Sequence, residues 1–140
     1  MGLLRGAIPF LAELIQHIDF DIQYDFMDVT SYEGTESKGE IKILKDLDTP
    51  VQGLDILLVE DIVDTGRTLD TIVRTLLHKG AKSVRIATLL DKPSRRIMDI
   101  QPDYVGFIIP NEFVVGFGLD YNQHYRGLPY IGVLKEECYG

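Results

Sequence analysis

Asp55-Ile56-Leu57-Leu58-Val59-Glu60-Asp61-Ile62-Val63-Asp64-Thr65-Gly66-Arg67-Thr68-Leu69 is the stretch that decides the fold. Its first part, residues 56–59, is a continuous apolar run without alternation, which is typical of a strand buried on both faces. Further on, apolar residues recur with the period of a helix at Leu69, Ile72, Val73, Leu76 and Leu77. The stretch therefore predicts strand, polar turn and helix. In open α/β sheets, ligands bind where such strands end.

The turn between strand and helix has the chemistry of a phosphate site. Residues 65–68 supply small hydroxyls and backbone N–H groups at a helix N-terminus, where anions bind. Just upstream, Glu60 and Asp61 suit a hard divalent cation such as magnesium, or sugar hydroxyls. Together they predict a sugar phosphate or nucleotide carried with magnesium. The simpler alternative is that Asp64 or Thr65 caps the helix and the two upstream acids are only solvated.

Size and charge narrow the classes of function. The 140 residues suit one domain, spanning 1–140, that can bury a single core. A net charge of −8 argues against a nucleic-acid surface, which needs a basic face. No apolar run approaches the roughly 20 residues of a membrane span. The single cysteine, Cys138, is interpreted as an inert thiol and fits a reducing cytosol, so we expect a cytoplasmic protein without membrane partners.

The rest of the chain continues the α/β pattern. Residues 2–4 read as the end of a strand, and residues 5–7 as a turn. Alternating apolar residues predict a half-exposed strand over 19–26, joined by the polar, mobile segment 30–39 to another over 41–43. The remaining expectations are a helix over 9–18, a helix end at Gly80, core strands over 84–90 and 104–109, a basic turn over 94–101, an apolar segment over 113–118 and a last strand over 130–134.

The stretch 59–68 resembles the phosphoribosyl-diphosphate signature of the type I phosphoribosyltransferases. Lys92 and residues 113–121 are similar to the hypoxanthine-guanine branch, which serves purine salvage, and the resemblance runs from about Leu3 to Tyr139. It implies an α/β fold with a mostly parallel sheet flanked by helices, a small hood and a flexible loop. In that family a few tens of residues precede the first strand, so the resemblance implies a chain shortened at its N-terminus, with a truncated first strand.

The resemblance assigns a role to each matching residue. Asp64 would be catalytic, accepting a proton from the purine ring nitrogen that attacks the sugar. Phosphoribosyl-phosphate binding falls to Glu60, Asp61, Asp64, Thr65, Gly66, Arg67 and Thr68, and diphosphate binding to Arg5, Gly6 and Arg126. The purine would meet Lys92, Phe113, Val114 and Asp120, with Mg2+ held by Glu60, Asp61 and Asp120, and Ser31 and Tyr32 in the flexible loop.

Taken alone, several of these residues have ordinary interpretations. Arg5-Gly6 could be a plain turn, the 30–39 segment a plain hairpin loop, and Lys92 and Arg126 surface charges. An aromatic such as Phe113 most often lies in the core. Arg5 also stands where the family commonly has lysine, which a loop that works through its backbone should tolerate.

The implied function is conversion of a 6-oxopurine and phosphoribosyl diphosphate into IMP or GMP and diphosphate, by a homo-oligomer, dimer or tetramer. The sequence does not rank hypoxanthine, guanine and xanthine. Three alternatives stay open: an inactive truncated copy, a nucleotide-sensing regulator that binds RNA or DNA, and a phosphoacceptor domain with acids at strand ends. The acidic balance speaks against the regulator. A phosphoacceptor domain would not need the phosphate-binding turn.

Overall fold

The computed structural model describes residues 1–31 and 40–139, and its centre is a six-stranded sheet in the order β3-β2-β1-β4-β5-β6. All neighbours pair in parallel except β2 and β3. This confirms the predicted α/β fold with a mostly parallel sheet. The strands are β1 (Gly2–Leu3), β2 (Phe26–Ser31), β3 (Ile41–Lys45), β4 (Asp55–Val63), β5 (Ser83–Asp91) and β6 (Tyr104–Ile108), with β7 (Val114–Val115) and β8 (Gly132–Val133) in a separate small sheet.

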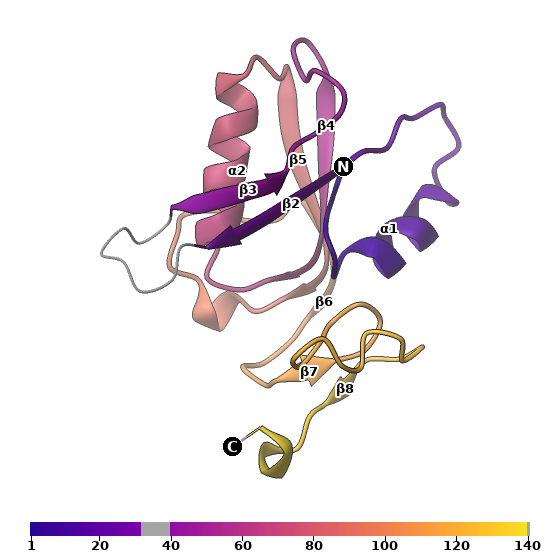
Figure 1. Ribbon diagram of the computed structural model, residues 1–140, viewed down its shortest axis with the longest axis vertical. Helices are drawn as coiled ribbons and strands as arrows, with labels where there is room; N and C mark the ends of the chain where they lie inside the picture. The colour runs from indigo at the N-terminus through magenta and orange to yellow at the C-terminus, as the bar shows by residue number, and fades with distance from the viewer. Residues whose placement is uncertain (32–39, 140) are drawn as a thin grey trace.

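Two α-helices, α1 (Ile8–Ile15) and α2 (Arg67–His78), lie on opposite faces of the sheet. Leu3 belongs to the core cluster that contains the buried side chains of α2, whereas its neighbour Gly2 faces Leu11 of α1. Consecutive strand residues point to opposite faces, so the two helices cover different sides. Figure 1 shows the β7–β8 sheet below the large sheet. None of the described helices is long and apolar enough to cross a membrane.

The central strand is longer than its apolar run. β4 stays paired with β5 from Asp55 to Val63, so Glu60 and Asp61 lie within the strand rather than after it. The turn is correspondingly short, and α2 begins at Arg67. At its other end Gly80 has φ +95°, as expected for the residue that follows a helix end.

Two N-terminal predictions were wrong. Residues 20–25 form no strand, and β2 instead covers Phe26–Ser31. The alternation that suggested a strand comes from side chains that stay in solvent, such as Phe20 (71% exposed) and Tyr24 (61% exposed). On the β2 side, β1 pairs only with Phe26 and Met27. Helix α1 also ends at Ile15, three residues before the predicted Ile18.

The strand over 104–109 exists but is no core strand. All five residues of β6 are exposed, with Phe107 at 64% and Ile108 at 72%. It pairs with β5 on one side and is the edge of the sheet, so its apolar side chains do not become core. The last predicted strand is likewise shorter, because only Gly132 and Val133 pair.

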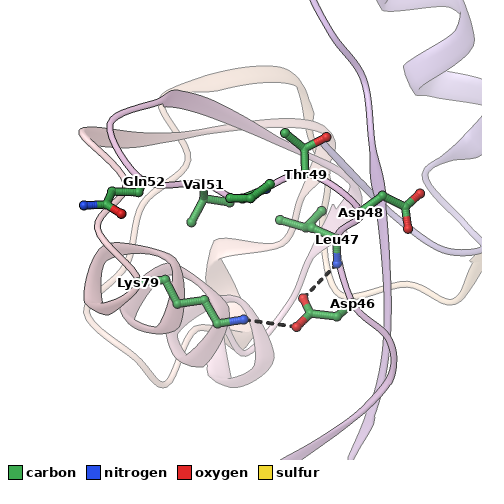
Figure 2. Close-up of a pocket in the computed structure, with 8 residues that line it drawn as sticks. Asp46, Leu47, Asp48, Thr49, Val51, Gln52 and Lys79 are labelled. Carbon is green, nitrogen blue, oxygen red and sulfur yellow. Dashed lines mark hydrogen bonds and ion pairs between the residues drawn. The ribbon is translucent and has the colours of Figure 1, made fainter.

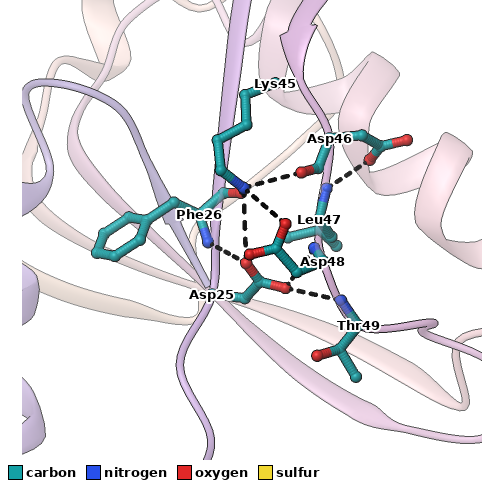
Figure 3. A network of polar contacts seen from close by, with 7 residues as sticks. All are labelled: Asp25, Phe26, Lys45, Asp46, Leu47, Asp48 and Thr49. Carbon is teal, nitrogen blue, oxygen red and sulfur yellow. Dashed lines mark hydrogen bonds and ion pairs between the residues drawn. The ribbon is translucent and has the colours of Figure 1, made fainter.

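The edge of the sheet where β4 begins is held by acids. Asp25 accepts backbone N–H groups of Phe26 (2.8 Å), Asp48 (2.8 Å) and Thr49 (3.0 Å), and forms an ion pair with Lys45 at 3.9 Å, as Figure 3 shows. These contacts fix the connector between β3 and β4 against the start of β2.

A second acid, Asp46, holds the same connector to the end of α2. Its carboxylate accepts the Leu47 N–H (2.8 Å) and pairs with Lys79 of the α2 C-cap (3.1 Å). The two groups border a hollow of about 340 Å³ lined by residues 46–52 and Lys79 (Figure 2).

Candidate active site

The polar residues singled out in the sequence gather where β4, β5 and β6 end. The Lys92 N–H donates to the Val63 carbonyl (3.0 Å), and the Ile109 N–H to that of Asp91 (2.9 Å). These bonds align the three strand ends, and with them the side chains that follow β4 and β5. The convergence expected for the carboxyl ends of parallel strands is therefore present.

Asp61 lies against the Arg5–Gly6 turn that leads into α1. A Cβ at Gly6 would overlap the Asp61 carboxylate, and one at Gly118 would overlap the carbonyl oxygen of Gly6. Both positions therefore need glycine, which lets two loops and a carboxylate approach closely. The Leu4–Arg5 peptide bond is cis.

Arg126 and Asp120 complete this corner. Arg126 forms an ion pair with Asp120 at 3.4 Å and donates to the carbonyl of Gly118 at 2.5 Å. Gln123 joins them, because its amide oxygen accepts from Arg126 and, at 3.2 Å, from Arg5, and its N–H donates to Asp120 (2.8 Å). We call this set the Asp61 cluster: Arg5, Gly6, Asp61, Asp120, Gln123 and Arg126.

Ionisation of Glu60 and Asp61, the acids near the end of β4, is unfavourable in the free chain. Burial raises the pKa of Asp61, and the negative charge of Asp120 adds to that, against lowering by the Ile62 N–H and Arg126. Burial, with Asp61 beside it, raises the pKa of Glu60 well above its usual range. A bound cation would remove this cost, because a nearby positive charge favours the ionised carboxylates.

Of the three acids predicted to bind magnesium, Asp61 and Asp120 fit one site, and Glu60 does not. Adjacent strand residues point to opposite faces, so Asp61 shares a face with the Arg5–Gly6 turn and Glu60 does not. In residues 1–31 and 40–139, no three potential ligand side chains cluster around one point. Magnesium commonly keeps several waters and takes one or two carboxylates plus substrate phosphates, which suits Asp61 and Asp120.

The turn 64–68, here the Asp64 turn, leaves the start of α2 open. Gly66 has φ +86° and makes no side-chain cap bond, while the Thr65 hydroxyl accepts the Arg67 N–H at 3.4 Å. Asp64 caps nothing, since its carboxylate accepts from Arg95 at 2.8 Å. The first N–H groups of α2 therefore point into a site that suits phosphate, and the helix-cap interpretation of Asp64 is wrong.

Lys92 follows β5 and is 8% exposed. Its ammonium has no hydrogen bond or ion pair within the described parts of the chain. The side chain is thus mostly covered, and a surface lysine is the wrong interpretation. Because no buried side-chain nitrogen of the described residues lacks a partner, the ammonium reaches solvent at the strand end, where a ligand can accept from it.

The aromatic Phe113 is not in the core. It is 36% exposed, stacks on Tyr139 with centroids 4.8 Å apart, and meets Tyr121 edge-on at 5.8 Å. Val114 follows in β7, paired with Val133. Both predicted purine contacts thus belong to the β7–β8 region, here the hood, beside the large sheet.

Only one of the two residues predicted in the flexible loop lies within the described residues. Ser31 is the last, exposed residue of β2, and Tyr32 lies outside the described residues. Sequence reasoning missed three contributors: Gln123, Arg95 and Arg96. The basic dipeptide after Lys92 was a usable signal, because two arginines beside a carboxylate-rich turn can pair with it, whereas nothing in the pattern singles out Gln123.

The comparisons with known proteins agree with this geometry. The family model for the phosphoribosyl transferase domain matches residues 1–122. Hypoxanthine-guanine phosphoribosyltransferases of Lactococcus lactis and Streptococcus agalactiae are 63% and 56% identical to the chain, covering 99% of it in each case and 76% and 78% of themselves.

Solved structures of hypoxanthine phosphoribosyltransferases have the same fold as this chain. A hypoxanthine phosphoribosyltransferase from Staphylococcus aureus superposes with a TM-score of 0.96 at 52% identity, over 99% of this chain and 76% of that one. A ternary substrates complex of the Trypanosoma cruzi enzyme gives 0.96 at 38% identity, over 100% and 77%.

Proposed function

This chain belongs to the phosphoribosyltransferase family, and we propose that its strand-end site transfers a phosphoribosyl group from phosphoribosyl diphosphate to hypoxanthine or guanine. The relatives at 56–63% identity are hypoxanthine-guanine phosphoribosyltransferases, so the chain is a pentosyltransferase of purine salvage. The observation that carries the assignment to this site is Lys92, which lies directly beside the Asp64 turn, is 8% exposed as a residue, and has no partner for its ammonium within the described residues.

The Asp64 turn binds the 5′-phosphate through backbone N–H groups at the N-terminus of α2. Asp64 then accepts the proton of the attacking purine nitrogen. Arg95 holds the Asp64 carboxylate in the structure at 2.8 Å, so it must share or release that carboxylate when the base binds. Both side chains are nearly half exposed, which makes the exchange easy.

The Asp61 cluster receives the diphosphate. Arg126 and the backbone of the Arg5–Gly6 turn face it, and Asp61 and Asp120 would hold Mg2+, which supplies positive charge to the leaving group. Gln123 fixes the two arginines relative to each other through one shared amide oxygen. With the arginines fixed in advance, little reorganisation is needed as charge develops.

Selectivity for the base follows from Lys92. The Lys92 ammonium group only donates hydrogen bonds, so it pairs with the exocyclic oxygen of a 6-oxopurine and not with the amino group of adenine. Phe113, which is 36% exposed and stacks on Tyr139 in the free chain, would stack on the base. A cytoplasmic location and a dimer or tetramer stay predictions.

The test is a turnover assay with phosphoribosyl diphosphate, magnesium and each of hypoxanthine, guanine, xanthine and adenine. Nucleotide from a 6-oxopurine but not from adenine supports the proposal. Circular dichroism on the same sample separates the alternatives, because a folded chain without turnover would indicate an inactive copy or a regulator. A salt-sensitive shift of RNA or DNA mobility would favour the regulator.

A further inference from the structure

Arg96 is an almost buried arginine outside the predicted site, and its guanidinium joins three parts of the strand edge. Its side chain is 8% exposed and forms an ion pair with Asp91, whose own side chain is 6% exposed. It also donates to the carbonyl of Asp64 (3.0 Å) and to that of Ile100 (2.7 Å). One rigid group thus connects the end of β5, the Asp64 turn and the segment that follows Lys92.

Each partner of Arg96 leads to a functional residue. Asp91 precedes Lys92 directly, so its carboxylate is one residue from the proposed purine donor. The carbonyl of Asp64 belongs to the residue proposed to accept the proton. The two residues proposed to contact the purine are therefore linked to the same guanidinium, Lys92 through its neighbour Asp91 and Asp64 through its carbonyl.

The phosphate-binding backbone of the Asp64 turn has a support of its own. The N–H groups of Ile97 and Met98 donate to the Thr65 carbonyl at 2.9 and 3.2 Å. Ile100 packs where a Cβ at Gly66 would collide with it. The two backbone hydrogen bonds do not involve the Arg96 side chain, so the turn keeps this support when the guanidinium is replaced.

We propose that Arg96 is a positioning residue that sets Lys92 and Asp64 relative to each other for the purine. This rests on the proposed function and adds a specific division: replacing Arg96 should disturb the alignment of the base more than the binding of phosphoribosyl diphosphate, because the phosphate-binding turn keeps two backbone hydrogen bonds of its own. The role needs arginine rather than any cation, because only the planar fork of a guanidinium serves several fixed acceptors at once.

The variant that tests this is Arg96→Lys, which keeps the charge and loses the fork. We expect kcat/KM for hypoxanthine to fall roughly tenfold to a hundredfold, as for other small misplacements of reacting groups. The Kd of phosphoribosyl diphosphate, measured by titration with magnesium, should change by less than about threefold, because two backbone hydrogen bonds still hold the turn.

The matched control is Arg74→Lys. Arg74 also pairs with a carboxylate, that of Asp70 at 2.5 Å, but its side chain is 69% exposed in the middle of α2. It should keep wild-type turnover. The second variant, Asp91→Asn, retains an acceptor oxygen and should lose part of kcat/KM. The double variant Arg96→Lys with Asp91→Asn should lose no more than the worse single one, since the two residues act through one contact.

The outcomes separate this inference from the function on which it rests. A wild-type chain without turnover overturns the proposed function itself. An active wild type whose Arg96→Lys variant behaves like Arg74→Lys, or loses phosphoribosyl diphosphate binding in step with kcat/KM, overturns only the role of Arg96. If Arg96→Lys does not fold, Asp91→Asn decides, and unchanged kcat/KM there also counts against the role.

Discussion

Carboxylic acids lie at both ends of the parallel strands, but their pKa values are shifted in opposite directions at the two ends. At the edge where β4 begins, burial would raise the pKa of Asp25, but N–H groups of Thr49, Phe26 and Asp48 lower it below its ordinary value. Asp46 likewise has a lowered pKa, through Lys79 and the Leu47 N–H. At the strand ends, burial raises the pKa of Glu60 and Asp61.

The difference separates acids that hold the fold from acids kept for a ligand. A carboxylate that already has N–H donors and a lysine beside it gains little from a further cation, whereas a desolvated one gains most when a cation arrives. Structural acids should therefore affect stability and leave turnover alone. Site acids should do the reverse, and substitutions at both edges can test this.

The largest effect is expected for Asp64→Asn, which should lower kcat by about 10²–10⁴ because the attacking nitrogen loses its proton acceptor. Stability should hardly change, since the lost ion pair with Arg95 is nearly half exposed. Steady-state kinetics and a thermal melt measure both. Binding of the nucleotide product should persist. Unchanged kcat would remove Asp64 from the base role, and Asp70→Asn on α2 is the matched control.

Lys92→Met should follow, with kcat/KM for hypoxanthine lowered about tenfold to a hundredfold, the range of one hydrogen bond to a charged group. The free chain should change little in stability, because the ammonium makes no hydrogen bond or ion pair within the described residues and methionine keeps most of the apolar side chain. Kinetics with each substrate varied in turn gives the comparison. Equal losses toward the purine and toward phosphoribosyl diphosphate would contradict a purine-specific role.

Asp25→Ala, near the start of β2, should lower stability and leave turnover unchanged. Three N–H groups lose their acceptor, which should lower the free energy of unfolding by about 1–3 kcal/mol. Turnover of the folded fraction should stay at the wild-type level. Urea unfolding and kcat, measured on the same sample, test the pair of statements. Lys79→Ala, which removes only the half-exposed pair with Asp46, is the milder control at about 0–1 kcal/mol.

The sequence predicted the strand-end acids and not the ones at the other edge. The Asp64 turn could be predicted because strand, turn and helix are consecutive in the chain, so local pattern fixes their geometry. The Asp61 cluster could not be derived this way. The hydrogen bond between Arg5 and Gln123 joins residues 118 positions apart, and only the resemblance to a family brought Arg5 and Arg126 together.

The same reason explains the misplaced strand. Alternation over 19–26 predicts an exposed face and a covered one, but which residues find a partner strand depends on β1, from elsewhere in the chain. Asp25 fell within that wrong prediction, so its clamp on Asp48 and Thr49 could not be expected. Tertiary pairing, rather than local pattern, decided both.

The smallest expected effect concerns the pH dependence of stability, to which Asp25 and Glu60 should contribute with opposite sign. Asp25 has a lowered pKa, so its contribution to stability is present above its ordinary value of 3.8 and is lost as the pH falls through the lower value of the folded state. Glu60 has a raised pKa, so the folded chain binds its proton more tightly, and stability falls as the pH rises from 4.5 through the raised value.

Glu60→Gln removes this second dependence. The variant should match the wild type at low pH, where both side chains are neutral, and be the more stable of the two at neutral pH. Asp25→Asn should also match the wild type at low pH and be the less stable one at neutral pH. Chemical unfolding at a series of pH values without magnesium measures both. If Glu60→Gln is destabilised at neutral pH, the Glu60 carboxylate has a partner that stabilises it, and the contrast between the two edges fails at this residue.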